Sequence, residues 1–254
     1  MVDWSRIVWD MAVPLAFFFA AGGMVSLAER NLPLRRVDRH AEFDMDVIGF
    51  AVTYVSGGLF LSLFGEIAAW IGRDPIGAGS LPRIVTIPAF FLLTDFLRFV
   101  AHWAMHSPTL WAVHRFHHSV SELYWFSGNR DTAVHTALLI LPSAVFAWLL
   151  DLPPAVAMFN LLLQILWNHI MHANVALPAA LSRRIEVVLV TPRLHELHHS
   201  LLPALRDRNF GSVFSFWDRV FGTFAAPDAV DRRLLAFGLE PGDRTSAVRM
   251  IAGV

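Results

Sequence analysis

Long stretches without a charged residue are the feature that most limits what this chain can fold into. Residues 11–28 and 47–65 contain no Asp, Glu, Lys or Arg. Each stretch is close to the roughly 20 residues that a helix needs to cross a bilayer. Only 16% of the 254 residues are charged and 56% are hydrophobic, which leaves too few charges to cover the surface of a soluble domain. The sequence therefore predicts an integral membrane protein.

Three further apolar stretches follow along the chain. The last two are joined through Asp151-Leu152-Pro153-Pro154, a link too short for anything but a hairpin. We expect an all-α fold, an integral membrane helical bundle with four or five membrane helices. The expected positions of these helices are about residues 7–28, 47–71, 84–101, 133–150 and 152–170.

The remaining residues, about 102–132 and 173–254, are expected to form a cytoplasmic histidine-rich helical cap within the same single domain, residues 1–254. Arginines give the orientation, because residues 29–46 hold four of them and residues 73–83 hold two. The positive-inside rule places the first of these loops in the cytoplasm. Successive crossings then bring every histidine-rich segment of this multi-pass protein to the cytoplasmic side.

Composition also excludes several classes of site. The chain has no cysteine, so disulfides, thiolate metal sites and cysteine nucleophiles are ruled out. Any metal must be held by nitrogen or oxygen. The formal net charge of −1 gives no support for nucleic-acid binding.

Histidines form the second constraining pattern, since eleven of the twelve lie between His102 and His199. Most recur at spacings of three or four residues, which place imidazoles on one side of a helix. The pattern HxxHH occurs at residues 114–118 and again at 195–199. Two occurrences in one chain of this length are not expected by chance. The others are the pair His102 and His106, the pair His169 and His172, and His135.

The number of histidines favours a centre with two metal ions. About ten imidazoles are too many for one zinc ion, which takes four ligands. Ten is enough for two ions with five or so ligands each, and imidazole suits iron, zinc or copper. The pattern leaves open whether His135 or His169 completes the set, and His40 lies in a polar loop away from the others. The candidate ligands are His102, His106, His114, His117, His118, His135, His169, His172, His195, His198 and His199.

The order of these patterns resembles the fatty acid hydroxylase and sterol desaturase superfamily, from about residue 95 to residue 223. Motifs beyond histidine add to the resemblance. They are Asp95-Phe96-Leu97-Arg98, Asn129-Arg130, His172-Ala173-Asn174, Thr191-Pro192-Arg193-Leu194 before His195, Asn209-Phe210-Gly211 and Trp217-Asp218-Arg219-Val220-Phe221-Gly222-Thr223. The chain departs from the common pattern at Thr136, where many relatives have proline, and at His169, a variable position.

The resemblance implies an O2-dependent di-iron hydroxylase or desaturase that acts on a fatty acyl, sterol or related lipid. It implies a cytosol-facing iron pair above a membrane-buried substrate tunnel, and the use of two externally supplied electrons. The chain has no GxGxxG fingerprint for a dinucleotide. We therefore expect a separate electron donor, a ferredoxin or a cytochrome with its reductase. Zinc can replace iron in purified material, because the same imidazoles accept either ion.

Acidic residues near the histidines are expected to support the metals. Neutral nitrogen ligands leave the ions more positive than a carboxylate-rich site would. Nearby acids should therefore accept a hydrogen bond from the outer nitrogen of a ligating histidine. The candidates are Asp95, Glu122, Asp131, Glu196 and Asp218.

Two other functions are compatible with parts of the pattern. Residues 195–199 also satisfy HExxH, the motif of an intramembrane zinc metalloprotease with Glu196 as general base. That reading leaves the other histidine patterns without a role. A non-enzymatic membrane metal-binding or transport protein is the other alternative, although transporters line a path across the bilayer with their ligands.

Overall fold

The computed structural model describes the backbone of residues 4–254 and the side chains from Met11 onward. Over this range the chain is helical, with isolated β-bridges as its only strand-like pairing, which confirms the all-α prediction. The α-helices are α1 (Trp4–Asn31), α2 (Phe43–Ile71), α3 (Arg83–Met105), α4 (Trp111–His118), α5 (Ala133–Leu149), α6 (Pro154–His172), α7 (Ala179–Ile185), α8 (Pro192–His198), α9 (Pro203–Arg206), α10 (Phe216–Val220) and α11 (Ala247–Ala252).

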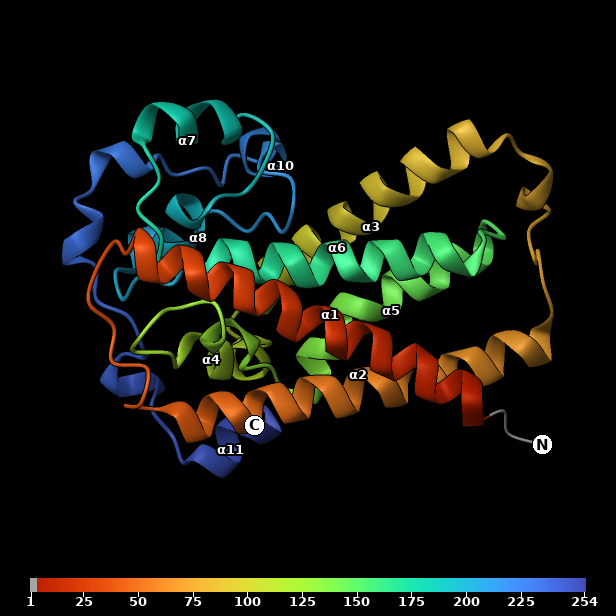
Figure 1. Ribbon diagram of the computed structural model, residues 1–254, viewed down its shortest axis with the longest axis horizontal. Helices are drawn as coiled ribbons and strands as arrows, with labels where there is room; N and C mark the ends of the chain where they lie inside the picture. Colours follow the sequence, from red (N-terminus) through yellow and green to blue (C-terminus); the bar gives the residue numbers. More distant parts are fainter. Residues whose placement is uncertain (1–3) are drawn as a thin grey trace.

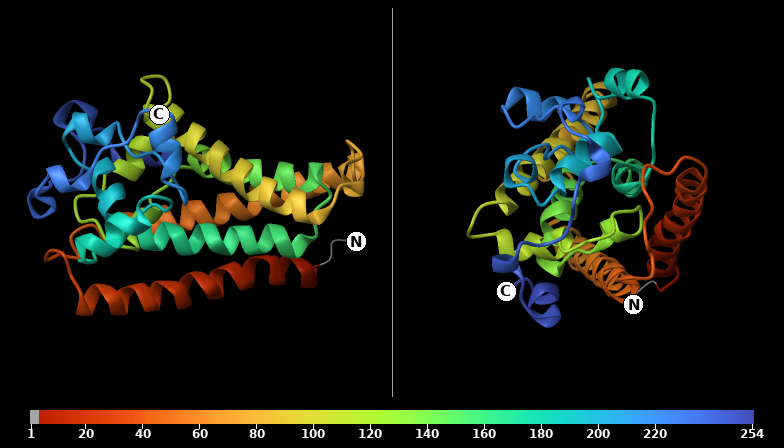
Figure 2. Two further views of the ribbon diagram at one scale, coloured as in Figure 1. Left: turned by 90° about the horizontal axis from the view of Figure 1, so that it is seen from above. Right: turned by 90° about the vertical axis from the view of Figure 1, so that its left-hand side faces the viewer.

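Five long helices run beside one another and form the body of the molecule (Figures 1 and 2). Helix α2 packs on α5, α5 lies between α2 and α3, and α1 packs along α6. Four of them are long and apolar enough to cross a membrane: α2, α3, α6 and the part of α1 from Met11 onward. Helix α5 is apolar but has only 17 residues. The short helices gather at one end of this bundle (Figure 1).

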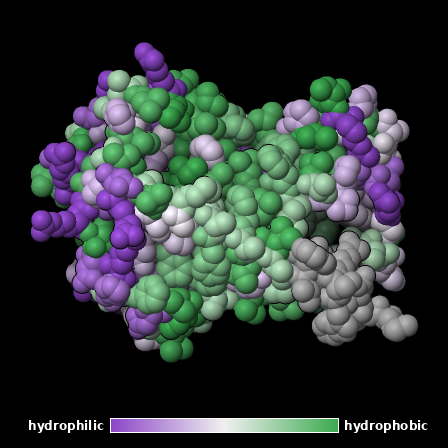
Figure 3. Space-filling view, in the orientation of Figure 1, coloured by the Kyte–Doolittle hydropathy of each residue, from purple (hydrophilic) through white to green (hydrophobic). Residues whose placement is uncertain are grey.

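Apolar side chains cover the outside of the bundle as well as its interior. Val55, Leu59, Leu63 and Ile67 recur along one side of α2, and each is more than half exposed. Figure 3 shows that such residues form a broad hydrophobic band between two ends that carry hydrophilic residues. Exposed apolar patches of this extent are unusual on soluble monomers and typical of a surface that faces lipid. The distribution supports the membrane prediction.

The end of the bundle without histidine clusters is held together by one acidic turn. Asp151 adopts a left-handed φ of 44° in the link between α5 and α6. Its carboxylate pairs with Arg73 at 3.0 Å and with Arg83 at 3.7 Å. Arg73 lies in the connection between α2 and α3, and Arg83 is the first residue of α3, so this turn fastens the hairpin to its neighbours.

At the opposite end, Glu29 near the end of α1 joins three segments that are distant in sequence. It is only 2% exposed and pairs with Arg39 at 2.8 Å. It also accepts hydrogen bonds from the backbone N–H groups of Trp125 and Asn174. The Asn174 amide in turn donates to the carbonyl of Arg35 at 2.8 Å. The asparagine of the His172-Ala173-Asn174 motif therefore anchors the loop between α1 and α2.

A second buried carboxylate connects α2 to the segment before α5. Asp46 accepts a 2.5 Å hydrogen bond from Arg130 Nε and a 2.7 Å hydrogen bond from the Tyr124 hydroxyl. Asp46 and Arg130 are 1% and 2% exposed. The Asp46 charge is tolerated because Arg130 is present, and Arg130 also pairs with Glu42 at 3.0 Å. The Asn129-Arg130 motif has a structural role in this contact.

Replacing Asp46 with Ala should strongly destabilise the protein, because the buried Arg130 guanidinium then loses its partner at Nε and keeps only the pair with the partly exposed Glu42. Breaking a buried pair in this way typically costs about 3–5 kcal/mol. The measurement is the thermal midpoint of the detergent-solubilised protein. Asp44→Ala is the matched control, since Asp44 lies in the same first turn of α2 but is exposed. Equal midpoints for the two variants would contradict the assigned role of Asp46.

Candidate metal centre

Nine histidines converge in two adjoining groups at the end of the bundle where the short helices lie. The first histidine group contains His102, His106, His114, His118 and His198. The second histidine group contains His117, His172, His195 and His199. Within each group, one nitrogen from every ring lies within 4.8 Å of those from all the others. The rings of His118 and His199 stack between the groups with centroids 4.6 Å apart.

The two HxxHH patterns each supply both groups. On α4, His114 and His118 are roughly 40° apart around the helix, while His117 lies roughly 60° to the other side of His114. His114 and His118 join the first group, and His117 joins the second. Helix α8 has the reverse arrangement, because His195 and His199 join the second group and His198 joins the first. The spacing thus serves two sites from one short helix.

The remaining members come from the ends of long helices. His102 lies in the last turn of α3, and His106 directly follows that helix. His172 is the last residue of α6. The groups therefore sit where the apolar helices meet the short helices of residues 111–220.

Hydrogen bonds fix which ring nitrogen faces the centre of the first group. His102 Nδ1 donates to the carbonyl of Phe210 at 2.8 Å, and His198 Nδ1 donates to the carbonyl of Arg208 at 2.9 Å. A neutral imidazole that carries its proton on Nδ1 has a lone pair on Nε2. The two Nε2 atoms lie only 2.9 Å apart, so two lone pairs face each other. A cation between them removes this repulsion.

The second group has the same arrangement. His172 Nδ1 donates to the carbonyl of Asn168 at 2.8 Å, which leaves the Nε2 lone pair pointing inward. That atom lies 2.9 Å from His195 Nε2 and 3.2 Å from the Nε2 atoms of His117 and His199. One proton per ring cannot satisfy so many close contacts. The donor set therefore fits a bound metal ion in each group.

Burial keeps these imidazoles neutral. It lowers the pKa of His114, His118, His195, His198 and His199 well below the ordinary histidine value, and the neighbouring imidazoles lower it further. Because a metal binds the neutral ring, depressed pKa values keep the ligands ready near pH 7.

Asp131 supports the second group and, among the expected acids, is the one that contacts a histidine of either group. One of its oxygens lies 3.1 Å from His117 Nδ1 and 2.9 Å from His135 Nδ1. Burial by itself would raise the pKa of Asp131, but His135 and His117 hold it below its usual range. His135 thus lies beside the centre, held by the carboxylate, and belongs to neither group.

Asp218 supports the first group indirectly, through the backbone that contacts His102. Its carboxylate accepts hydrogen bonds from the backbone N–H groups of Phe210 and Gly211 at 2.7 and 2.9 Å, which holds the carbonyl that binds His102. Asn209 has a left-handed φ of 56°. A Cβ on Gly211 would lie 2.6 Å from the carbonyl oxygen of Phe214. The motif Asn209-Phe210-Gly211 is therefore a turn shaped to present one carbonyl.

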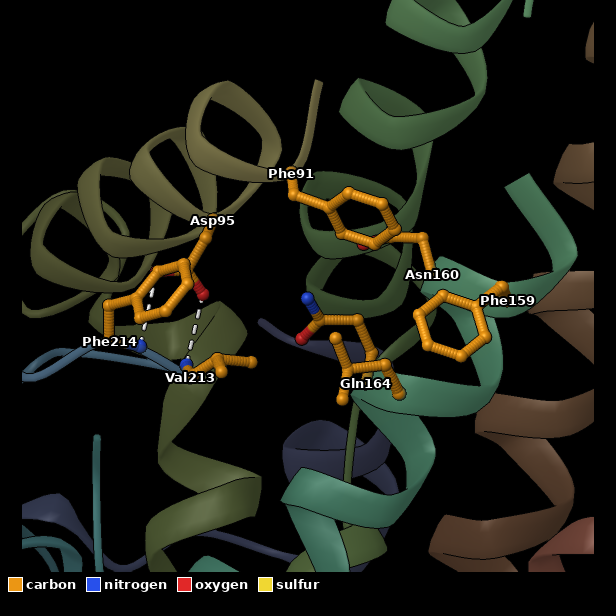
Figure 4. Close-up of a pocket in the computed structure, with 8 residues that line it drawn as sticks. Phe91, Asp95, Phe159, Asn160, Gln164, Val213 and Phe214 are labelled. Carbon is orange, nitrogen blue, oxygen red and sulfur yellow. Dashed lines mark hydrogen bonds between the residues drawn. The ribbon is translucent and has the colours of Figure 1, made fainter. Parts of the chain in front are cut away.

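Asp95 and Glu196 do not contact histidines, contrary to the expectation from sequence. Asp95 accepts hydrogen bonds from the backbone of Val213 and Phe214 (Figure 4) and from Trp217 Nε1. It therefore fastens the segment after Gly211 to α3. Glu196 pairs with Arg35 at 2.5 Å and also with Arg232. Between residues 11 and 254, Glu122 has no hydrogen bond to a histidine either.

His169 is not brought to either group. Its Nε2 donates to the carbonyl of Phe18 at 3.1 Å, and its ring packs against Phe18 and Trp125 at centroid distances of 4.5 and 4.8 Å. The physical reason is the position of His169 around the axis of α6. Three residues before His172, its side chain points toward α1.

Sequence reasoning missed one acidic partner and three carbonyl partners. Asp207 Oδ1 lies 3.0 Å from His106 Nδ1, and this contact lowers the pKa of Asp207. The carbonyls are those of Asn168, Arg208 and Phe210. A backbone carbonyl has no signature of its own in a sequence, although the turn motif at residues 209–211 marked the segment.

The long apolar helices and the paired histidine groups define a multi-pass membrane protein with two clusters of residues that could each hold a metal ion. Comparison with known proteins agrees with this class, because the sequence model named "Fatty acid hydroxylase" matches residues 87–223. The chain belongs to the fatty acid hydroxylase family, which confirms the resemblance seen in the sequence.

Three curated relatives illustrate the similarity. The alkylglycerol monooxygenase of Caenorhabditis elegans is 32% identical over 52% of this chain and 25% of its own length. The human alkylglycerol monooxygenase is 36% identical over 54% of this chain and 30% of its own length. The ornithine lipid hydroxylase OlsE of Rhizobium tropici is 28% identical over 58% of this chain and 44% of its own length. The chain thus spans less than half the length of these relatives. No solved structure matches it.

Replacing Gly128 with Ala should weaken metal binding in the second group. A Cβ at this position would lie 2.3 Å from Cγ of His172, so the imidazole must move. Residues that orient a metal ligand typically contribute roughly 10- to 100-fold in affinity, and a loss of that size is expected in metal titrations. Gly23→Ala is the control, because a Cβ there meets nothing within 4 Å. Unchanged metal affinity in Gly128→Ala would contradict the expected displacement of His172 as a ligand.

Proposed function

We propose that this chain is an O2-dependent di-iron oxidoreductase that hydroxylates or desaturates a C–H bond of a lipid. The observation that carries the proposal is the convergence of nine buried imidazoles into two adjoining groups with their lone pairs directed inward. The names of the relatives support a lipid substrate, since they are a monooxygenase of alkylglycerols and a hydroxylase of an ornithine lipid.

The proposed ligands are the nine members of the two groups, and the proposed ions are iron. Imidazole also accepts zinc, so purified protein can carry that ion in place of iron. Bound iron would supply the activation of O2, with two electrons from outside the chain, for removal of hydrogen from an unactivated carbon. A ferredoxin or a cytochrome with its reductase is the proposed electron donor.

The protein's own residues hold, orient and shield this centre. Carbonyl acceptors keep the Nδ1 protons of His102, His172 and His198 in place, so that each Nε2 stays unprotonated. Phe210 is fully buried, and its ring lies 5.7, 5.0 and 5.6 Å from the rings of His102, His106 and His198, where it excludes water from the first group. The proposed location of the centre is the cytoplasmic side, because Arg30 in the last turn of α1 and Arg35, Arg36 and Arg39 in the loop that follows lie at the same end.

The arrangement of Glu196 argues against the zinc metalloprotease alternative. In HExxH the glutamate must face the metal, whereas Glu196 is paired with both Arg35 and Arg232. The transport reading requires ligands along a path across the bilayer, whereas both groups gather at one end of the bundle. Metal analysis separates the three cases: two firmly bound irons favour the oxidoreductase, one zinc the protease, and readily exchanging ions the transporter.

Changing His117 or His198 to Ala should abolish turnover and reduce bound iron, because each change removes one inward lone pair from one group. Turnover is measured by lipid mass spectrometry of cells that express the chain, as a gain of one oxygen or a loss of two hydrogens. Iron is measured by elemental analysis of the purified protein.

Two histidine variants serve as controls for this experiment. His40→Ala changes an exposed loop residue, and His169→Ala changes a buried imidazole outside both groups. Both should retain iron. Full activity in His117→Ala or His198→Ala would refute the proposed centre, and iron loss in His169→Ala would refute the proposed ligand set.

A further inference from the structure

A cavity of about 220 Å³ lies between α3, α6 and the segment at residues 213–214 (Figure 4). Its walls are almost entirely apolar and include Phe91, Phe159 and Phe214. Phe159 is 60% exposed, so this side of the cavity faces the surroundings of the bundle. Helices α3 and α6 both line the cavity, and the rings of Phe91 on α3 and Phe159 on α6 lie 5.8 Å apart.

Two side-chain amides interrupt these apolar walls. Gln164 directs its carboxamide into the cavity (Figure 4) and has no hydrogen-bond partner among the described residues. Asn160, one turn earlier on α6, is 1% exposed. Its Nδ2 donates to Ser143 Oγ at 3.1 Å, while its Oδ1 is buried without a partner. In the part of a helix that crosses a membrane, polar groups without partners are costly. A ligand that bears a polar group would supply the hydrogen bond that the Gln164 carboxamide lacks.

The cavity is linked to both histidine groups by the helices that line it. Helix α3 carries Asp95 at the cavity and His102 of the first group, seven residues or about 10 Å further along. Helix α6 carries Gln164 at the cavity and His172 of the second group, eight residues or about 12 Å further along. The cavity is therefore lined by two helices that each lead to a histidine group.

The chemistry of the cavity indicates a neutral hydrogen-bonding group on the ligand. Asp95 is the one ionisable side chain among the lining residues. Both of its oxygens already accept hydrogen bonds, from Val213, Phe214 and Trp217. No charge is left to bind an ionic headgroup, whereas the Gln164 amide can both donate and accept. A hydroxyl, ether or carbonyl group matches these amides.

We propose that this cavity binds the apolar chain of the lipid substrate and that Gln164, with Asn160 behind it, selects chains that carry a neutral oxygen group. The inference rests on the proposed function, because it assigns the substrate of the same centre. Gln164 is then a specificity-determining residue, placed about 12 Å along α6 from His172. The oxygen group lies inside the apolar band of the protein, away from the headgroup.

The test compares binding of octadecanoic acid with binding of its positional hydroxy isomers to the purified full chain in detergent. Radiolabelled octadecanoic acid is the probe, and each hydroxy isomer is the competitor. One narrow range of hydroxyl positions should compete better than octadecanoic acid itself, by roughly three- to tenfold, as expected for one added neutral hydrogen bond. Gln164→Met should abolish this preference, because it keeps the length of the side chain and removes the amide.

Two further variants complete the experiment. Ser62→Ala, whose hydroxyl only returns to the Gly58 carbonyl of its own helix, should keep the preference. Asn160→Leu should reduce it. Equal competition by all isomers in the wild-type chain, or a preference that survives in Gln164→Met, would overturn the proposal. Thermal midpoints of all variants identify any loss of fold. Position-selective binding without any oxidised lipid in cells would instead count against the proposed function alone.

Discussion

Lone pairs of buried imidazoles that face one another at about 3 Å determine how the rest of this structure is built. Uncharged rings in that arrangement repel, and protonated rings are disfavoured by burial. The surroundings therefore have to hold each ring in place before a cation arrives. Carbonyls of Asn168, Arg208 and Phe210, together with Asp131, do so from outside. The membrane helices supply the rigid frame, and Asp218 with the turn at residues 209–211 supplies the fine positioning.

Much of the fold could be predicted from the sequence, because a charge-free run of about 20 residues has few alternatives to a membrane helix. The hairpin between α5 and α6 followed from the same reasoning and from two adjacent prolines. Helix ends were less predictable. Helix α3 continues to Met105. The His102 side chain finds its hydrogen-bond partner inside the protein, so its backbone can remain helical. The short helices of residues 179–252 depend on tertiary contacts and have no strong periodicity of their own.

The structure brings together nine of the eleven histidines that the sequence singled out, without His135 and His169, and the arrangement of the nine was not predictable. Spacing identified the histidines, but the division between the groups depends on how α4 and α8 are rotated in the folded protein. His169 has the spacing of a ligand and yet turns toward Phe18. Glu196 stands beside His195 in sequence, but its partners Arg35 and Arg232 come from distant segments. Contacts of this kind are set by packing over more than 30 residues of separation, which no local pattern encodes.

The division of each HxxHH pattern between both groups has a mechanical consequence. Helices α4 and α8 each carry imidazoles for two neighbouring sites, and each is too short to bend within itself. A small rotation of either helix therefore displaces donors on both sides at once. The positions of the imidazoles in the two groups therefore cannot be changed separately by moving these helices. Adjustment of one group alone is left to the residues that serve a single group, such as His106 at the end of α3 and His172 at the end of α6.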